Sequence, residues 1–167
     1  MSASPIDLAI VGGGLAGGLI ALAAHRANPA MEIALVEAGD VFGGNHRWSW
    51  FDSDLGPEGN ALMGAFRAKT WTGGNEVRFP DLTRHLSADY RSLDSRDFDA
   101  GLRRLLPQGA LHLNSRAETL AADRVTLADG RTIAAHRVID CRDPAPSPDL
   151  TGGWQVFVGQ HRQMEIG

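Results

Sequence analysis

The clearest chemistry in the sequence lies in a glycine loop near the amino terminus. It fits the pattern G-x-G-x-x-G and consists of Gly12, Gly13, Gly14, Leu15, Ala16 and Gly17. Gly12 permits a tight turn, Gly14 has no Cβ to keep a diphosphate from the backbone, and Gly17 lets a helix pack closely on a strand. Because the following helix presents amides and a positive dipole end to an anion, the loop predicts a dinucleotide site.

Glu37 is the second residue suited to that chemistry. It follows Gly17 by twenty residues and ends an apolar segment, so its carboxylate can accept hydrogen bonds from ribose hydroxyls. The same negative charge repels a 2′-phosphate, which disfavours NADP at this site and leaves FAD and NAD. A glycine turn that only packs a helix against a strand is the alternative interpretation.

A second cluster is the stretch GGNHRWSW at residues 43–50. Trp48 offers an aromatic face that can stabilise a cation, and His46 can hydrogen-bond or shuttle a proton. We therefore take His46 and Trp48 as candidate catalytic residues and Asn45 as a candidate cofactor contact. A packed aromatic corner is the competing interpretation of the same residues.

Other kinds of site find less support. The remaining histidines show no pair at metal-ligand spacing, so we predict no metal site. The formal net charge of −4 argues against nucleic-acid binding, because no basic surface is implied. The single cysteine, Cys141, lies in the apolar run RVIDCR and is expected to be a small buried side chain. Arg84 is a further candidate for a cofactor contact.

These residues need elements that bring them together. Residues 6–11 and 32–37 are apolar runs typical of buried parallel strands, and residues 15–28 predict a helix that Pro29 ends. Strand, glycine turn, helix and strand in this order form a βαβ unit. Residues 38–80 are rich in Gly, Asp and Trp, and we expect an irregular insertion there.

The second half of the chain predicts further elements. Residues 94–106 have apolar side chains at helical spacing after a cap at Asp94 or Ser95, and residues 110–114 predict a strand. Residues 124–135 predict a hairpin that turns at Asp129–Gly130, and residues 137–141 another buried strand. The expected fold is α/β: a Rossmann-like FAD-binding domain of the glutathione-reductase type with a small antiparallel meander. The meander favours FAD over NAD by fold analogy.

The run from Leu8 to Ala24 carries no charge over seventeen residues, which is close to the length of a membrane span. Five of those residues are glycine, and the residues before the run lack the Lys or Arg of a signal peptide. We therefore expect a strand and a helix there.

Five segments lie along the sequence in this order: DLAIVGGGLAGGLIALA, GGNHRWSW, VRFPDLTRHLSADYRSL, RVIDCR and GGWQVFVGQ. They follow one another as they do in bacterial lycopene beta-cyclases. From about Asp7 to Gln160 the chain resembles the amino-terminal portion of this family. The glycine loop is shared by many enzymes, whereas NHRWSW and WQVFVGQ are far more specific.

The resemblance implies an FAD-dependent carotenoid cyclase, an isomerase or intramolecular lyase of β-carotene biosynthesis. Such an enzyme converts the linear ends of lycopene and other linear-ended carotenoids into β-ionone rings without net redox change. Its FAD is reduced by NADPH as an external reductant. The resemblance also implies a cytoplasmic protein in peripheral contact with the inner face of the cytoplasmic membrane, with neither a metal nor a nucleic acid as partner.

Two departures from the family pattern bear on these expectations. Asp143 follows Arg142 where the family continues with Gly, and the acidic Phe-Leu-Glu-Glu-Thr-like motif, a candidate proton donor, is absent. We expect residues 1–145 to form the FAD-binding domain and residues 146–167 to begin a truncated substrate-binding segment. The isolated 167-residue chain is expected to be marginally stable and inactive.

Two other functions remain open from the sequence. One is a redox FAD-dependent oxidoreductase or monooxygenase that shares the glycine loop but not the chemistry. The other is a catalytically inactive FAD-binding fragment. Consumption of NAD(P)H in step with product distinguishes the redox enzyme, since cyclisation uses no net reductant.

Overall fold

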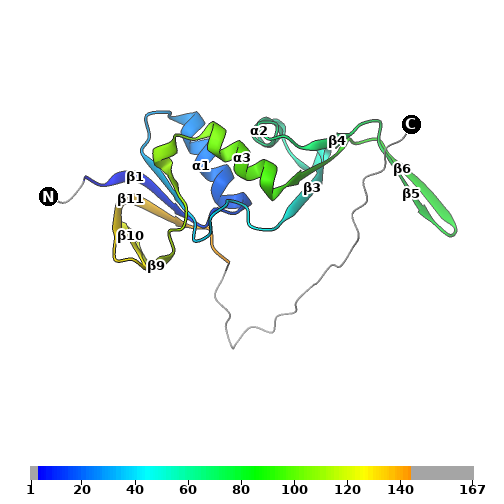
Figure 1. Cartoon of the computed structure of the whole chain (residues 1–167). Coiled ribbons are helices and arrows are strands. Elements are labelled where there is room, and N and C mark those ends of the chain that lie inside the picture. Colours follow the sequence, from blue (N-terminus) through cyan, green and yellow to red (C-terminus); the bar gives the residue numbers. More distant parts are fainter. Residues whose placement is uncertain (1–3, 144–167) are drawn as a thin grey trace.

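A six-stranded sheet forms the body of the protein in the computed structural model, which describes residues 4–143 (Figure 1). Its strand order is β8-β2-β1-β11-β10-β9. In chain order the strands are β1 (Ile6–Val11), β2 (Ile33–Val36), β8 (Leu111–His112), β9 (Ala117–Ala121), β10 (Arg124–Leu127) and β11 (Thr132–Asp140). The first four strands in the sheet order are parallel and the last pairs are antiparallel. This confirms the Rossmann-like fold with an antiparallel meander.

Strand β11 belongs to both parts of the sheet. Its first residues pair with β10, as in Ile133↔Val125, and its last residues pair with β1, as in Ile139↔Ile10. The sequence suggested a hairpin and a separate strand here, and the structure joins them into one strand of nine residues. The predicted turn is confirmed, since Gly130 has a φ of 85°.

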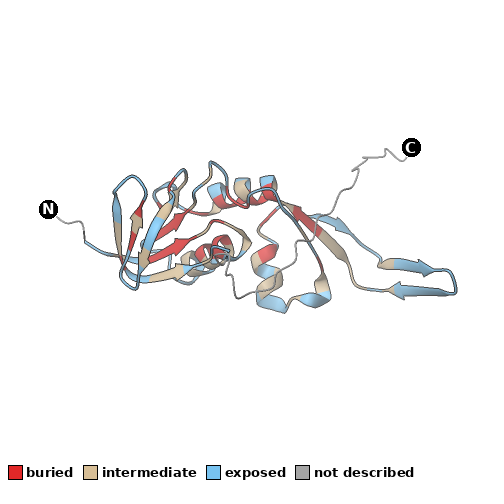
Figure 2. Ribbon diagram, turned by 90° about the horizontal axis from the view of Figure 1, so that it is seen from below, coloured by how far each residue is buried: buried red, intermediate tan, exposed pale blue. Residues whose placement is uncertain are grey.

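The two faces of the sheet are covered by different elements. Leu8 and Ile10 face a core shared with helices α1 (Leu15–Ala27) and α3 (Ser95–Leu105). Ala9 and Val11, which alternate with them, pack with side chains of the meander. Figure 2 shows these central strands as the most buried part of the molecule. The uncharged run from Leu8 to Ala24 is thus a strand and a helix, and no described helix is long and apolar enough to cross a membrane.

Helix α3 follows its sequence pattern closely. Asp94 caps it, accepting a hydrogen bond from the amide of Asp97 at 2.9 Å, and Phe98 and Leu102 are fully buried. At its start the cap and the dipole both favour the aspartate, which fixes where the helix begins.

The expectation of an irregular insertion at residues 38–80 is wrong. That stretch contains β3 (Arg47–Phe51), α2 (Pro57–Met63), β4 (Lys69–Trp71) and β5 (Asn75–Phe79). Strands β3 and β4 flank β7 (Tyr90–Asp94) in a three-stranded antiparallel sheet, and β5 pairs with β6 (Leu82–Leu86) in a hairpin. Single 3₁₀ turns lie at Asp52–Asp54 and Gln108–Ala110. The pairing of β3 with β7 joins residues such as Trp48 and Leu93, which lie far apart in the chain, so local sequence patterns could not reveal it.

The β5–β6 hairpin projects from the end of the molecule that lies opposite β1 (Figure 1). The substrate-binding segment expected at residues 146–167 lies outside the described residues.

Candidate functional site

Two of the loop glycines are required by packing. A Cβ on Gly17 would lie 2.0 Å from the carbonyl oxygen of Gly12, and one on Gly12 would lie 2.8 Å from the backbone of Cys141. Gly12 also has a φ of 102°, which favours glycine. The loop therefore holds β1, α1 and the end of β11 against one another.

Gly14 differs from these two glycines. A Cβ there would meet no described atom within 4 Å, so it would project into open space. Gly14 precedes α1, and in the described structure neither a side-chain cap nor an acidic residue occupies the first turn of that helix. The start of α1 thus borders open space and carries no acidic side chain in its own first turn, which fits a diphosphate.

Glu37 is fixed by two backbone amides. Its Oε2 accepts a hydrogen bond from Gly13 at 2.8 Å, and its Oε1 accepts one from Gly39 at 2.8 Å. Each carboxylate oxygen can accept a second hydrogen bond. Glu37 can therefore bind ribose hydroxyls while it continues to hold the glycine loop.

These residues line one open hollow of about 470 Å³. Its lining includes Gly12, Gly14, Leu15, Ala16, Glu37, Gly43, Gly44, His46, Trp48, Cys141, Arg142 and Asp143. The structure thus brings together most of the residues that the sequence suggested. Sequence reasoning missed Gly43, Gly44 and Arg142 as lining residues. Position after β11 could have indicated Arg142, because the carboxyl ends of parallel strands meet at one edge of a sheet.

The aromatic cluster is partly a packed corner and partly a wall of the hollow. Trp50 is buried, and its Nε1 has no hydrogen-bond partner among residues 4–143. Trp48 packs edge-on against Phe98, with ring centroids 5.2 Å apart, and also lines the hollow. His46 is exposed there and stacks on Trp48 at 6.0 Å. Trp50 thus belongs to a packed corner, whereas His46 and Trp48 lie at the hollow, and their catalytic role stays a prediction.

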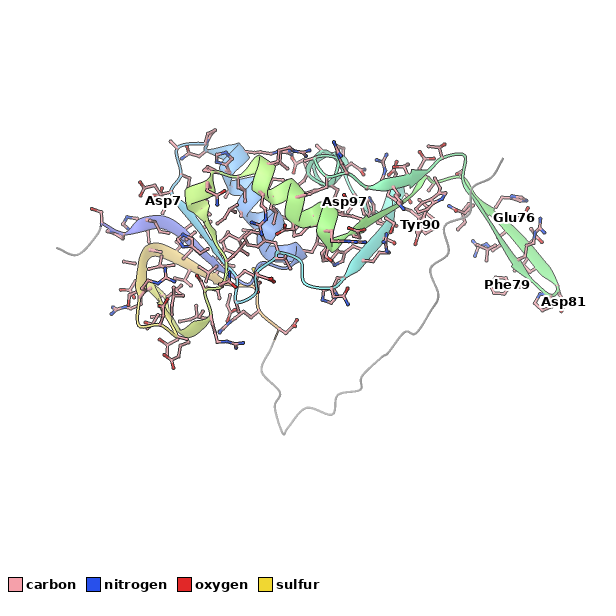
Figure 3. The ribbon with its side chains drawn as sticks, viewed as in Figure 1. Asp7, Glu76, Phe79, Asp81, Tyr90 and Asp97 are labelled. Atoms are coloured by element: carbon pink, nitrogen blue, oxygen red, sulfur yellow. The ribbon has the colours of Figure 1, made fainter. Side chains whose placement is uncertain are left out.

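Two predicted cofactor contacts lie elsewhere. Asn45 lines an adjoining polar hollow with Gly44, His46, Arg47 and Asp94. Arg84 lies on β6, in the projecting hairpin where Figure 3 labels Glu76 and Phe79. Arg84 therefore does not line the hollow. The prediction failed because the local sequence gave no sign that residues 75–86 form a separate hairpin.

Helix α3 holds the loop between β2 and β3. Asp99 accepts a hydrogen bond from the amide of Phe42 at 2.9 Å, and Arg103 donates one to the carbonyl of Asp40 at 3.1 Å. Arg103 is also paired with Asp99 at 2.8 Å, which raises the pKa of its guanidinium. Two side chains of α3 therefore restrain this loop.

The end of β11 reaches the glycine loop. The amide of Cys141 donates to the carbonyl of Val11 at 2.7 Å. Burial and the nearby charge of Asp140 raise the pKa of the Cys141 thiol, so it stays neutral near pH 7. Within residues 4–143 no group of three or more His, Cys, Asp or Glu residues is placed to hold a metal ion.

Solved structures share this fold at low sequence identity. The chain aligns with a peptidyl tryptophan dihydroxylase, QhpG, at a TM-score of 0.56 and 21% identity, covering 88% of this chain and 35% of that one. It aligns with 2,6-dihydroxypyridine-3-hydroxylase from Arthrobacter nicotinovorans at a TM-score of 0.53 and 15% identity, covering 82% and 37%. These likenesses establish the fold.

Sequence comparison establishes the family. The chain is 40% identical to a lycopene beta-cyclase of Pseudescherichia vulneris, over 92% of this chain and 39% of that protein. It is 36% identical to the lycopene beta-cyclase of Pantoea ananas, over 92% and 40%. The chain thus spans about two fifths of the length of these curated relatives. Since the family model described as "Lycopene cyclase protein" matches residues 7–166, the chain belongs to the lycopene cyclase family.

Proposed function

We propose that the chain is the FAD-binding portion of a lycopene beta-cyclase. The observation that carries this proposal is the hollow at the end of β1. The hollow contains the uncapped start of α1, the open space beside Gly14 and the fixed carboxylate of Glu37. His46 and Trp48 line it as an aromatic wall. Membership of the lycopene cyclase family makes the carotenoid the substrate that best suits this wall.

Each part of the hollow has a role in that proposal. The amides that follow Gly14 bind the diphosphate, and Glu37 binds ribose hydroxyls. When bound, FAD reduced by NADPH would supply an electron-rich ring system that stabilises positive charge in the carotenoid. Trp48 adds an aromatic face that stabilises positive charge, and His46 holds or moves a proton at its imidazole nitrogens.

The proposed reaction is an isomerisation that balances without an oxidant. A proton adds to the terminal double bond of lycopene, the neighbouring alkene closes the ring, and another proton leaves the cation. At the hollow, His46 is exposed to solvent and Trp48 is partly exposed. The acidic residues that line the hollow are Glu37 and Asp143. Because Glu37 is engaged by two amides and Asp143 is exposed to solvent, we propose that the proton donor lies outside the described residues.

The organisation of the longer protein is part of the same proposal. Residues 1–145 form the FAD-binding domain and residues 146–167 begin the substrate-binding segment. By itself the 167-residue chain binds FAD and does not cyclise lycopene. In the longer protein, peripheral contact with the inner face of the cytoplasmic membrane gives access to lycopene and other linear-ended carotenoids.

Titration of the purified chain with FAD, followed by flavin fluorescence, tests the cofactor. We expect saturable binding of one FAD per chain, and an absence of binding to the folded chain contradicts the proposal. Chromatography of lycopene incubated with the longer protein, FAD and NADPH without oxygen then tests the reaction. Ring formation without matching consumption of NADPH is the expected result.

A redox flavoenzyme is the second candidate, because two solved structures with this fold are hydroxylases by name. In a parallel assay with oxygen supplied, an oxygenated product formed with one O2 and one NADPH consumed per turnover favours this candidate over cyclisation. Stoichiometric FAD binding without any reaction of the longer protein favours an inactive FAD-binding protein.

A further inference from the structure

Arg142 is placed beside the glycine loop by the backbone. It lies two residues after the end of β11, and the amide of the intervening Cys141 donates a hydrogen bond to the carbonyl of Val11 at the end of β1. A Cβ on Gly12 would lie 3.0 Å from the backbone nitrogen of Arg142, so the two segments are in close contact. Arg142 therefore lines the hollow from a position that the sheet fixes.

The side chain of Arg142 is oriented by Asp140. Its Nε donates to Oδ1 of Asp140 at 2.9 Å, and its Nη2 donates to Oδ2 at 2.8 Å. Because a guanidinium has five N–H donors, three remain for another partner. The ion pair keeps the planar group in one orientation and so lowers the entropy lost when an anion binds.

Among the charged side chains that line the hollow, one cation can bind an anionic ligand. Of the described residues that line it, Glu37 and Asp143 are acidic and Arg142 is the one permanent cation. The amides at the start of α1 supply only partial positive charge. A diphosphate bound in this hollow therefore needs the positive charge of Arg142 to offset its electrostatic repulsion by the two carboxylates.

We infer that Arg142 binds the diphosphate of the nucleotide, with Asp140 as the residue that positions it. This inference rests on the proposed function, since it presupposes a dinucleotide in the hollow. Arg142 is then a determinant of affinity for the phosphate part of the ligand and not for its nucleoside part.

Calorimetric titration of the purified chain with ADP and with adenosine tests the inference, because the two probes differ only in the diphosphate. For Arg142→Gln we expect ADP affinity to fall about 10- to 100-fold, as for loss of a charge-assisted hydrogen bond, with adenosine affinity unchanged. The ADP affinity of Arg142→Lys should lie between those of wild type and Arg142→Gln, since lysine keeps the positive charge but lacks the planar set of donors of the guanidinium. Asp140→Asn should also weaken ADP binding and leave adenosine binding unchanged.

Arg131→Gln is the matched control. Arg131 pairs with Asp129 at 2.7 Å, with the same spacing in sequence, but in the turn between β10 and β11. We expect it to leave both affinities unchanged, and circular dichroism shows that each variant is folded. Equal affinity of wild type and Arg142→Gln for ADP, or an equal loss for both probes, overturns the inference. If wild type binds neither probe, the proposed function itself fails.

Discussion

At the scale of single residues, the loop glycines are needed for different reasons. Gly17 is confined by the carbonyl of Gly12, whereas Gly14 borders open space. Chemical denaturation should therefore separate Gly17→Ala from Gly14→Ala. We expect Gly17→Ala to prevent stable folding, and Gly14→Ala to change the free energy of unfolding by less than about 1 kcal/mol.

Gly14→Ala should affect FAD binding more than it affects stability. A methyl group there projects into the hollow, so Gly14→Ala should lower FAD affinity although the chain is folded. Titration of the folded variant with FAD measures this loss. Normal FAD affinity of Gly14→Ala would contradict the placement of the diphosphate at this position.

Glu37 permits a second prediction at this scale. In Glu37→Gln one carboxylate oxygen becomes an amide donor, so either Gly13 or Gly39 loses its hydrogen-bond acceptor. Leaving such a donor unpaired costs about 1–3 kcal/mol. Urea denaturation measures the change, with the exposed Glu118→Gln as a control that should be neutral. Equal stability of the two variants would show that the Glu37 contacts contribute nothing.

At the scale of elements, α3 positions the loop that carries the aromatic wall. Asp99 accepts the amide of Phe42 and pairs with Arg103, so Asp99→Ala removes one restraint on residues 38–46 and the partner that orients Arg103 for the other. We expect the amide of Phe42 to exchange its hydrogen faster, while amides inside β1 keep their protection. Arg96→Ala serves as the control, because Arg96 is on the same helix with a side chain that is 92% exposed. Unchanged exchange at Phe42 in Asp99→Ala would exclude this anchoring.

The elements also show how far the sequence predicts this molecule. The βαβ unit, the cap at Asp94 and the turn at Gly130 were predictable, because each depends on residues close together in the chain. The β3–β7 pairing and the place of Arg84 were not predictable. They depend on contacts between distant segments that have no local periodicity.

For the site the same distinction applies. The glycine loop and Glu37 are recognisable by spacing, and the structure brings both to one hollow. Arg142 enters the hollow because β11 lies beside β1; a strand before Arg142 was predictable, but the pairing of that strand with β1 was not. The anchoring of the loop by Asp99 likewise joins residues 57 positions apart.

At the scale of the whole molecule, His112 should make stability depend on pH. Burial is the main cause that lowers its pKa, and the charge of Arg131 adds to it. Below a pH of about 6.5 the unfolded chain binds a proton that the folded chain resists, so stability falls as pH falls, by at most about 1.4 kcal/mol per pH unit. Above that pH both forms are neutral and the effect vanishes.

Thermal denaturation between pH 7.5 and 5.5 measures this dependence, where those values are about one unit on either side of the ordinary histidine pKa. We expect the loss of stability to be smaller in His112→Gln than in wild type. The exposed His136→Gln should behave as wild type does. Identical pH dependence of all three proteins would exclude His112 as the cause.

The projecting hairpin allows a further prediction at this scale. Phe79 and Leu82 are 58% and 53% exposed on either side of its turn, where Figure 3 labels Phe79 and Asp81. Exposed apolar groups promote association but add little to folding. The double variant Phe79→Ser with Leu82→Ser should therefore raise the solubility limit with little change in melting temperature. A large drop in melting temperature would show that these side chains pack in the folded protein.

The central place of β1 in the sheet has a consequence for the protein during synthesis. One neighbour, β2, follows β1 soon, but the other, β11, is made only after the roughly 95 residues between Val36 and Thr132, which take about 5 to 20 seconds on a ribosome. Through that interval β1 is an open apolar edge, the kind of surface that recruits other strands. The hollow at its end has no Arg142 until then. Nascent chains are thus exposed to aggregation and to chaperones for a period that ends when β11 is synthesised and pairs with β1.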